Sequence, residues 1–154
     1  MPISLSRLAA SNAKSTDLAL LLLRVFAGGM MAVGHGWGKL IKFGSDPSKF
    51  PDPLGIGGTP SFAGAIMGEL VCCVLIAIGL FTRLACIPAV FTMGVAALVV
   101  HGKDPLFMGG GAAKEPALIY LAMFVVILIA GPGRWSLDRK IFAGGGGGGG
   151  GGRK

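Results

Sequence analysis

Four long blocks of mainly apolar residues, separated by polar loops, make up most of the chain. The blocks cover residues 18–41, 61–81, 84–100 and 115–130. Helices of about 17–24 residues match the ~30 Å hydrocarbon layer of a bilayer. The strands of a membrane barrel would alternate apolar and polar residues, and these blocks do not. The pattern therefore predicts an all-α fold, a four-helix transmembrane bundle with both termini on the same side.

The segments between the blocks carry clear start and stop signals for helices. A loop rich in Gly, Pro and Asp, residues 42–60, separates the first two blocks. Only Thr82 and Arg83 separate the second block from the third, which predicts a tight antiparallel pair of helices. Glu115 and Pro116 begin the fourth block, and this order suits the first turn of a helix.

Composition divides the chain into three parts, two polar or glycine-rich ends and an apolar middle. We expect a polar N-terminal segment over 1–17, a membrane domain over 18–142 and a flexible glycine-rich tail over 143–154. The uninterrupted apolar run at 18–23 is short for a signal peptide, and Arg24 ends it. The first block is therefore interpreted as a retained helix.

The charge distribution indicates topology. Hydrophobic residues make up 53% of the chain and charged residues 14%, and the net charge is +7. The cations lie in loops and at the ends, so we expect contacts with membrane lipid and no nucleic-acid binding. The side that holds the termini has eight cations against five on the other, which predicts a multi-pass protein of the cytoplasmic membrane with cytoplasmic termini. The eight are Arg7, Lys14, Arg83, Arg134, Arg139, Lys140, Arg153 and Lys154, and the five are Lys39, Lys42, Lys49, Lys103 and Lys114.

Several ionisable residues lie within or beside the apolar blocks. Arg24 and His35 are eleven residues apart, about three helical turns, so they share a stripe with Lys39 one turn beyond. Charged groups inside a membrane turn away from lipid or serve a function. With the depth along each helix taken into account, a set of five is predicted to converge in the outer half of the membrane: His35, Lys39, Glu69, His101 and Glu115.

Two interpretations of these residues stay open. They form a ligand or proton-transfer pocket, or they serve the fold alone. In the second case Glu69 neutralises Arg24 or His35, and His101 and Glu115 are ordinary polar helix ends.

The cysteines and glycines favour packing roles. Cys72, Cys73 and Cys86 lie in apolar segments without metal-binding spacing, and no metal site is expected. Adjacent helical residues point about 100° apart, which weakens a redox pair at Cys72 and Cys73. Haem ligation is not expected either, because His35 and His101 both fall at the outer edge. Two rows of small residues suggest close helix contacts: Gly34 with Gly38, and Gly64, Gly68 with Cys72.

Motifs in four places resemble the DoxX family of membrane proteins. Residues 23–40 read LRVFAGGMMAVGHGWGKL, similar to that family's first helix, which an Arg opens and a His-Gly-x-x-Lys-Leu pattern closes. Glu69 with Gly79, Thr82, Arg83 and Leu84 resembles the second helix and its turn. The stretches 115–120 and 131–138, the latter GPGRWSLD, are similar to the last helix and its ending. Cys72 and Cys73 depart from the small residues common there.

The resemblance implies a link to quinones. The DoxX family is named after a small membrane subunit of an archaeal quinol oxidase and thiosulfate:quinone oxidoreductase system. The expected function is therefore a subunit of, or partner to, a quinone-linked membrane oxidoreductase, with no covalent cofactor. The candidate substrate- or quinone-binding residues are Arg24, His35, Lys39, Glu69, His101, Glu115 and Tyr120.

A second hypothesis is a non-catalytic membrane anchor or a small-solute carrier. The sequence contains no dinucleotide-binding or metal motif, and the glycine-rich tail is low complexity and not a phosphate loop. Under the quinone-linked hypothesis, the expected partner is a redox-enzyme subunit. A carrier with four helices would need a homo-oligomer, so self-association is left open.

Overall fold

The computed structural model describes residues 12–142 and is helical throughout, with no strand in that range. The first long helix runs from Ala13 to Phe43 and the second from Gly58 to Ile78. The third long helix runs from Thr82 to Val100. The predicted tail, 143–154, and residues 1–11 of the polar N-terminal segment lie outside the described residues.

Each of the three long helices contains one π-helical turn. The first consists of α2 (Ala13–Met31), η1 (Ala32–Gly36) and α3 (Trp37–Phe43). The second consists of α4 (Gly58–Ile66), η3 (Met67–Val71) and α5 (Cys72–Ile78), and the third of α6 (Thr82–Val95) and η4 (Ala96–Val100). The remaining elements are η2 (Pro47–Lys49), α7 (Glu115–Ala130) and α8 (Leu137–Phe142).

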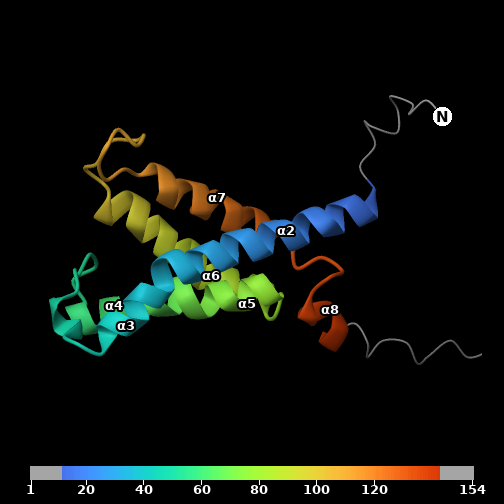
Figure 1. The fold of residues 1–154 in the computed structure, drawn as a ribbon, viewed down its shortest axis with the longest axis horizontal. Coiled ribbons are helices and arrows are strands. Elements are labelled where there is room, and N and C mark those ends of the chain that lie inside the picture. The colour runs from blue at the N-terminus through green and yellow to red at the C-terminus, as the bar shows by residue number, and fades with distance from the viewer. Residues whose placement is uncertain (1–11, 143–154) are drawn as a thin grey trace, which may run out of the picture.

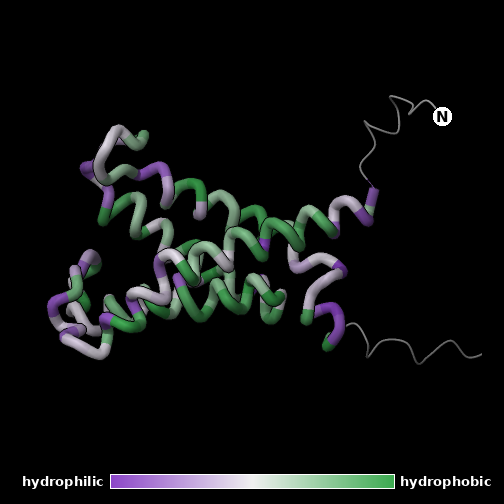
Figure 2. Tube along the Cα trace, in the orientation of Figure 1, coloured by the Kyte–Doolittle hydropathy of each residue, from purple (hydrophilic) through white to green (hydrophobic). Residues whose placement is uncertain are grey.

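Three helices are long and apolar enough to cross a membrane, and α7 is apolar but shorter. The 16 residues of α7 span about 24 Å at ~1.5 Å per residue. Large apolar side chains point outward along these helices, with Val33, Leu98 and Ile129 each more than 70% exposed. Figure 2 shows the resulting apolar colouring along the helices, with polar residues concentrated near the ends.

A side chain distant in sequence determines where α6 begins. Thr82 and Arg83 are predicted to form the turn, and this is wrong: they begin α6, and the turn lies before them, where Gly79 and Phe81 have positive φ angles. The Asp138 carboxylate accepts hydrogen bonds from the amides of Phe81 and Thr82 at 2.6 and 2.9 Å. It thereby caps the first turn of α6.

The first helix also begins five residues earlier than predicted. The Asn12 side chain accepts from the Ser15 amide at 2.9 Å, and the Ser15 hydroxyl oxygen accepts from the Asn12 amide at 3.3 Å. These reciprocal bonds form a capping box that starts the helix at Ala13.

The helices pack as two antiparallel pairs joined at one end. Helix α2 packs on α5 and α7, while α6 packs on α5 and α7. In Figure 1 the start of α2, the turn between α5 and α6, and α8 gather at one end, and the two long loops lie at the other. A hydrogen bond of 2.9 Å from the Arg134 amide to Asp17 Oδ1 connects the C-terminal segment to the start of α2.

Glycines bring the helix backbones into direct contact. A Cβ atom at Gly36 would lie 2.7 Å from Leu70 Cβ and 2.8 Å from the carbonyl oxygen of Glu69. At Gly28 it would lie 2.5 Å from the carbonyl oxygen of Cys73. The contact row on the first helix is therefore Gly28, Ala32 and Gly36, all buried at a spacing of four.

The predicted close contacts of Gly34 and Gly38 on the first helix are wrong. Those of Gly64, Gly68 and Cys72 on the second helix are right in part. No atom of another segment lies within 4 Å of a Cβ built at Gly34, Gly38 or Gly64. Gly68 does pack closely, against the Thr92 side chain of α6, and Cys72 is buried. A spacing of four recurs on more than one face of a glycine-rich helix, so spacing alone did not identify the buried face.

The contact at Gly36 predicts a difference between two matched substitutions. Gly36→Ala should destabilise the protein by about 1–3 kcal/mol, because its methyl group overlaps Leu70 and the Glu69 backbone. Gly34→Ala, two residues away in the same π-helical turn, should stay within about 0.5 kcal/mol of the parent. Thermal unfolding in mild detergent measures both, and equal effects would contradict the close contact.

Candidate functional site

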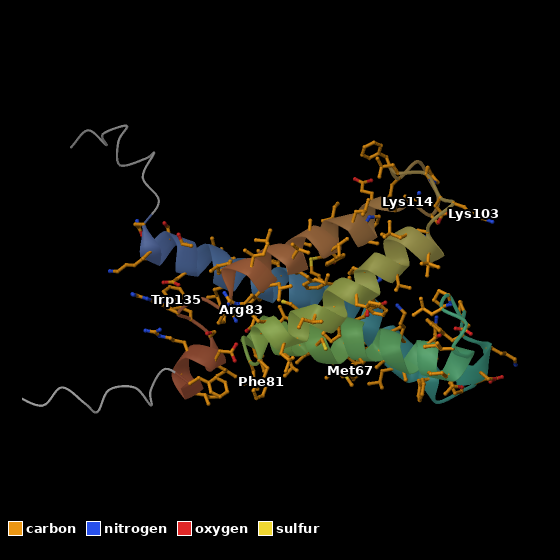
Figure 3. All side chains as sticks on the ribbon, turned by 180° about the vertical axis from the view of Figure 1, so that it is seen from behind. Met67, Phe81, Arg83, Lys103, Lys114 and Trp135 are labelled. Carbon is orange, nitrogen blue, oxygen red and sulfur yellow. The ribbon has the colours of Figure 1, made fainter. Side chains whose placement is uncertain are left out.

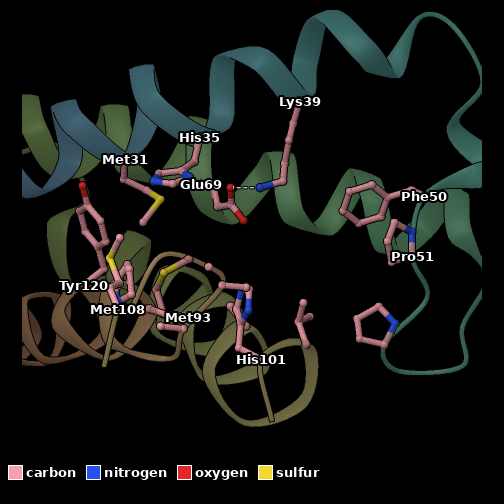
Figure 4. Close-up of a pocket in the computed structure, with 18 residues that line it drawn as sticks. Met31, His35, Lys39, Phe50, Pro51, Glu69, Met93, His101, Met108 and Tyr120 are labelled. Atoms are coloured by element: carbon pink, nitrogen blue, oxygen red, sulfur yellow. Dashed lines mark hydrogen bonds and ion pairs between the residues drawn. The ribbon is translucent and has the colours of Figure 1, made fainter. Parts of the chain in front are cut away.

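A cavity of about 460 Å³ lies between the two helix pairs, near the end that holds the long loops. The first long helix and η3 form one wall, and α6, η4 and α7 form the other (Figure 4). Most lining side chains are apolar, including Met31, Met93 and Met108, and the loop residues Phe50, Pro51 and Pro53 complete the wall. The polar lining residues are His35, Lys39, Glu69, His101 and Tyr120.

An ion pair joins the first two long helices within one wall of the cavity. Lys39 Nζ contacts Glu69 Oε2, and Figure 4 shows both side chains beside the cavity. Glu69 is 6% exposed, so its carboxylate depends on Lys39 for compensation of its charge. Lys39 keeps 26% of its side chain accessible. The pair therefore has a buried anion and a cation that reaches solvent or the cavity.

The aromatic and imidazole groups stand around this pair. The His35 ring meets Tyr120 edge-on, with 6.1 Å between ring centroids, and Tyr120 stacks on buried Phe124 at 6.2 Å. His101 Nδ1 lies 2.8 Å from the Asp104 carboxylate. His35, Tyr120 and His101 thus lie at the cavity wall with these neighbours.

The structure separates two of the predicted site residues from the others. Glu115 lies outside the cavity lining, and its carboxylate accepts from the Met108 amide at 3.1 Å, which anchors the loop before α7. Arg24 lies at the opposite end of the bundle, fully buried, where Nη2 donates to the carbonyl oxygen of Trp135 at 2.7 Å. Glu69 is paired with Lys39, and neither Arg24 nor His35 forms that ion pair.

The three π-helical turns surround the same cavity. His35 belongs to η1, Glu69 to η3, and Ala96 and Val100 to η4. A π turn inserts one residue into an α-helix and rotates the side chains that follow, and such turns are frequent at functional sites. Sequence reasoning missed these turns, because no residue pattern in the three segments signals them.

Asp52 organises the loop that covers one side of the cavity. Its carboxylate accepts from the amides of Ile56 and Gly57 at 3.0 and 2.6 Å, and from the Ser61 hydroxyl at 2.8 Å. The Ser61 hydroxyl and then the Gly57 amide lower the pKa of Asp52. Sequence reasoning also missed this role, since Asp52 is one of several Asp, Gly and Pro residues in the predicted loop 42–60.

The cysteines lie in the helix packing. Cys72, Cys73 and Cys86 are buried free thiols, and Cys73 Sγ lies 3.2 Å from the carbonyl oxygen of Gly68. Among residues 12–142, no group of three or more His, Cys, Asp or Glu side chains is arranged to hold a metal ion.

Comparison with known proteins identifies the family. The sequence model named DoxX matches residues 19–102, which cover the first three long helices and the turn after them. The chain belongs to the DoxX family. The matched region contains His35, Lys39, Glu69 and His101, while Tyr120 follows it on α7.

Two relatives of this DoxX protein are both described as uncharacterized. It is 35% identical over 111 residues to an uncharacterized membrane protein of Mycobacterium tuberculosis, an alignment that covers 60% of this chain and 68% of the relative. It is 32% identical over 114 residues to an uncharacterized protein of Haemophilus influenzae, covering 73% and 83% respectively. No solved structure matches the chain.

Because Lys39 and Glu69 are buried to different extents, we expect their substitution to lower the stability of this DoxX protein by different amounts. Lys39→Met leaves the buried carboxylate unpaired and should cost about 3–5 kcal/mol. Glu69→Gln leaves a cation that can extend to water and should cost about 1–2 kcal/mol. Thermal unfolding in mild detergent tests this order. The double variant should be more stable than Lys39→Met alone, and simple additivity of the two losses would contradict the pairing.

The lowered pKa of Asp52 predicts an acid-sensitive loop. A carboxylate with a lowered pKa stabilises the folded loop above its ordinary pKa, and this contribution is lost as the pH falls through the lowered value. Protection of the Ile56 and Gly57 amides from hydrogen exchange should therefore weaken below about pH 4. In Ser61→Ala the midpoint should move to higher pH, whereas Ser48→Ala should leave it unchanged. An unchanged midpoint in Ser61→Ala would contradict the assignment.

Proposed function

We propose that this DoxX protein is a membrane-embedded, quinone-binding subunit of an oxidoreductase system whose redox centre resides on another subunit. The quinone headgroup would enter the cavity beside Lys39 and Glu69. In the same proposal, the three long helices and the shorter α7 cross the cytoplasmic membrane as one bundle with both termini on the cytoplasmic side. The cavity would then open toward the outer surface.

The arrangement of the chain ends supports this topology. The start of α2 and the segment before α8 are hydrogen-bonded through Asp17 and Arg134, so both lie at one end of the molecule. Cytoplasmic segments are enriched in Lys and Arg, and among the described residues this end holds six of the eleven cations, buried Arg24 included. The 16 residues of α7 cover about 24 Å, and neighbouring helices and local thinning of the bilayer accommodate so short a span.

The observation that carries the functional proposal is an ion pair at the wall of a cavity whose lining is mostly apolar. A quinone needs an apolar slot, hydrogen-bond donors for its carbonyl oxygens and acceptors for its protons. The Lys39 ammonium and the Tyr120 hydroxyl are donors, and the Glu69 carboxylate is a proton acceptor. His35 and His101 can donate or accept through their ring nitrogens. The cavity of about 460 Å³ suits a single aromatic ring with its substituents.

The proposal predicts that quinone copurifies with the protein and depends on Glu69. Solvent extraction and quantitation from protein in mild detergent should recover near-stoichiometric quinone from the parent chain. Glu69→Gln should retain less than about a tenth of that amount, since the loss of one charged contact costs roughly 1.5–3 kcal/mol. Asp46→Asn neutralises an exposed loop carboxylate that does not line the cavity and should retain the parent amount.

Two results would contradict this proposal. One is the absence of quinone from the parent after purification from quinone-containing membranes and after addition of quinone in detergent. The other is equal retention in Glu69→Gln and Asp46→Asn. Either result would favour the alternative of a membrane anchor or a solute carrier, and affinity capture in mild detergent would then distinguish a partner protein from a homo-oligomer.

A further inference from the structure

The C-terminal segment 131–142 lies across the end of the bundle opposite the cavity (Figure 1). Hydrogen bonds fix its backbone and the Asp138 side chain to the helices, among them the bond from the Arg134 amide to Asp17 Oδ1. The Arg24 guanidinium donates to the carbonyl oxygen of Trp135 at 2.7 Å, and the Asp138 amide donates to that of Gly79 at 2.8 Å. The Asp138 carboxylate caps α6 through the amides of Phe81 and Thr82. The segment is thus a rigid platform and not a loose end.

The same bonds leave this end with an excess of exposed positive charge. Its two carboxylates, Asp17 and Asp138, are both engaged by backbone amides. Asp17 is also 3.8 Å from the guanidinium of Arg134. Against these two anions stand five exposed cations, an excess of three: Lys14, Arg83, Arg134, Arg139 and Lys140.

Exposed apolar side chains lie next to the cations on this platform. Trp135 is 55% exposed and Phe142 is 60% exposed, and Ile141 lies between Phe142 and Lys140. Two hollows flank the segment: Arg134, Arg139 and Phe142 line one of about 470 Å³, and Arg134, Trp135 and Lys140 line another of about 450 Å³. Each hollow therefore offers cationic groups beside apolar side chains, and the carboxylates of Asp17 and Asp138, both engaged by backbone amides, also line the first hollow.

The opposite end of the molecule has no such excess. In the described residues it holds five cations, Lys39, Lys42, Lys49, Lys103 and Lys114, and five anions, Asp46, Asp52, Glu69, Asp104 and Glu115. Figure 3 shows Lys103 and Lys114 at that end, and Arg83 and Trp135 at the platform end. The two ends thus differ in net charge while both are rich in lysine or arginine.

From this juxtaposition we propose that the platform, segment 131–142, binds the headgroup of an anionic phospholipid. The residues that would contact it are Arg134, Trp135, Arg139 and Lys140. The phosphodiester contacts the exposed cations, while Trp135, Ile141 and Phe142 enter the acyl–headgroup boundary. Aromatic rings favour that boundary, and each Lys or Arg near an anionic leaflet adds to the attraction. Segment 131–142 then sits at headgroup depth because its backbone and the Asp138 side chain are fixed to Arg24 of α2 and to the first turn of α6. This inference does not depend on quinone binding.

A lipid-competition experiment with matched variants tests the site. The full chain is purified in a neutral detergent, and retention of phosphatidylglycerol or phosphatidylcholine is measured by native mass spectrometry during titration. The test variant is Arg139→Gln/Lys140→Gln, and the control is Lys103→Gln/Lys114→Gln, which removes the same charge from the opposite end. All four side chains are solvent-accessible in some part, and thermal unfolding checks that both variants remain folded.

The expected result is preferential retention of phosphatidylglycerol by the parent. The test variant should bind it about 10- to 30-fold more weakly, because each cation near an anionic lipid surface contributes about 1 kcal/mol and two are removed. The control should stay within about 2-fold of the parent. Arg134→Gln should weaken binding in the same direction, because Arg134 lines both hollows. Equal retention of the two lipids by the parent would overturn the proposal. Equal losses in test and control variants would overturn it as well, since the attraction would then follow net charge alone.

Discussion

The approach of η1 to η3 at Gly36 is the contact on which the candidate site depends. In a membrane, the surrounding lipid is as apolar as the helices, so burial of apolar surface gives little reason for two helices to associate. Close backbone contact and polar pairing have to supply that association. Gly36 lets the first helix touch Leu70 and the Glu69 backbone, and this brings Lys39, one turn further along, to the Glu69 carboxylate. The ion pair and the glycine therefore support each other: without the contact the carboxylate would be buried without its cation.

The sequence contained enough information for the helices and for much of the cavity lining. The apolar blocks are long and bounded by Gly and Pro, so their helical character followed from length, and depth along each helix brought His35, Lys39, Glu69 and His101 together. It did not contain the partner of Glu69, because Arg24, His35 and Lys39 share one stripe and periodicity cannot rank them. It also did not reveal the first turn of α6, whose cap is Asp138, 56 residues beyond Thr82. The π turns rotate later side chains by an amount that no average period describes.

Arg24 is buried, as predicted from the sequence, but it lies at the end of the bundle opposite the cavity. Its burial is complete, as expected for a cation within an apolar block. Its guanidinium, however, turns toward the C-terminal segment, where Gly79 and Ser136 lie against it and Trp135 supplies the carbonyl oxygen. The absence of a side chain at Gly79 provides the room that the guanidinium occupies. Arg24 therefore closes the end of the bundle opposite the cavity, and the two intramembrane charges Arg24 and Glu69 serve different ends of the fold.

The form of the Lys39–Glu69 pair bears on whether it serves the fold alone. A buried ion pair adds little stability compared with well-packed apolar residues of the same volume, since desolvation offsets most of the attraction between the charges. A pair that served only to hold two helices together would be most stable if other side chains packed tightly around it and left no cavity. Here the buried carboxylate and the partly accessible ammonium both border a cavity of about 460 Å³. A cavity beside charged groups forfeits packing on that side. The arrangement is costly for a structural link and well suited to a group that receives a ligand, because Lys39 can move on its flexible stem while Glu69 stays fixed by the contact at Gly36.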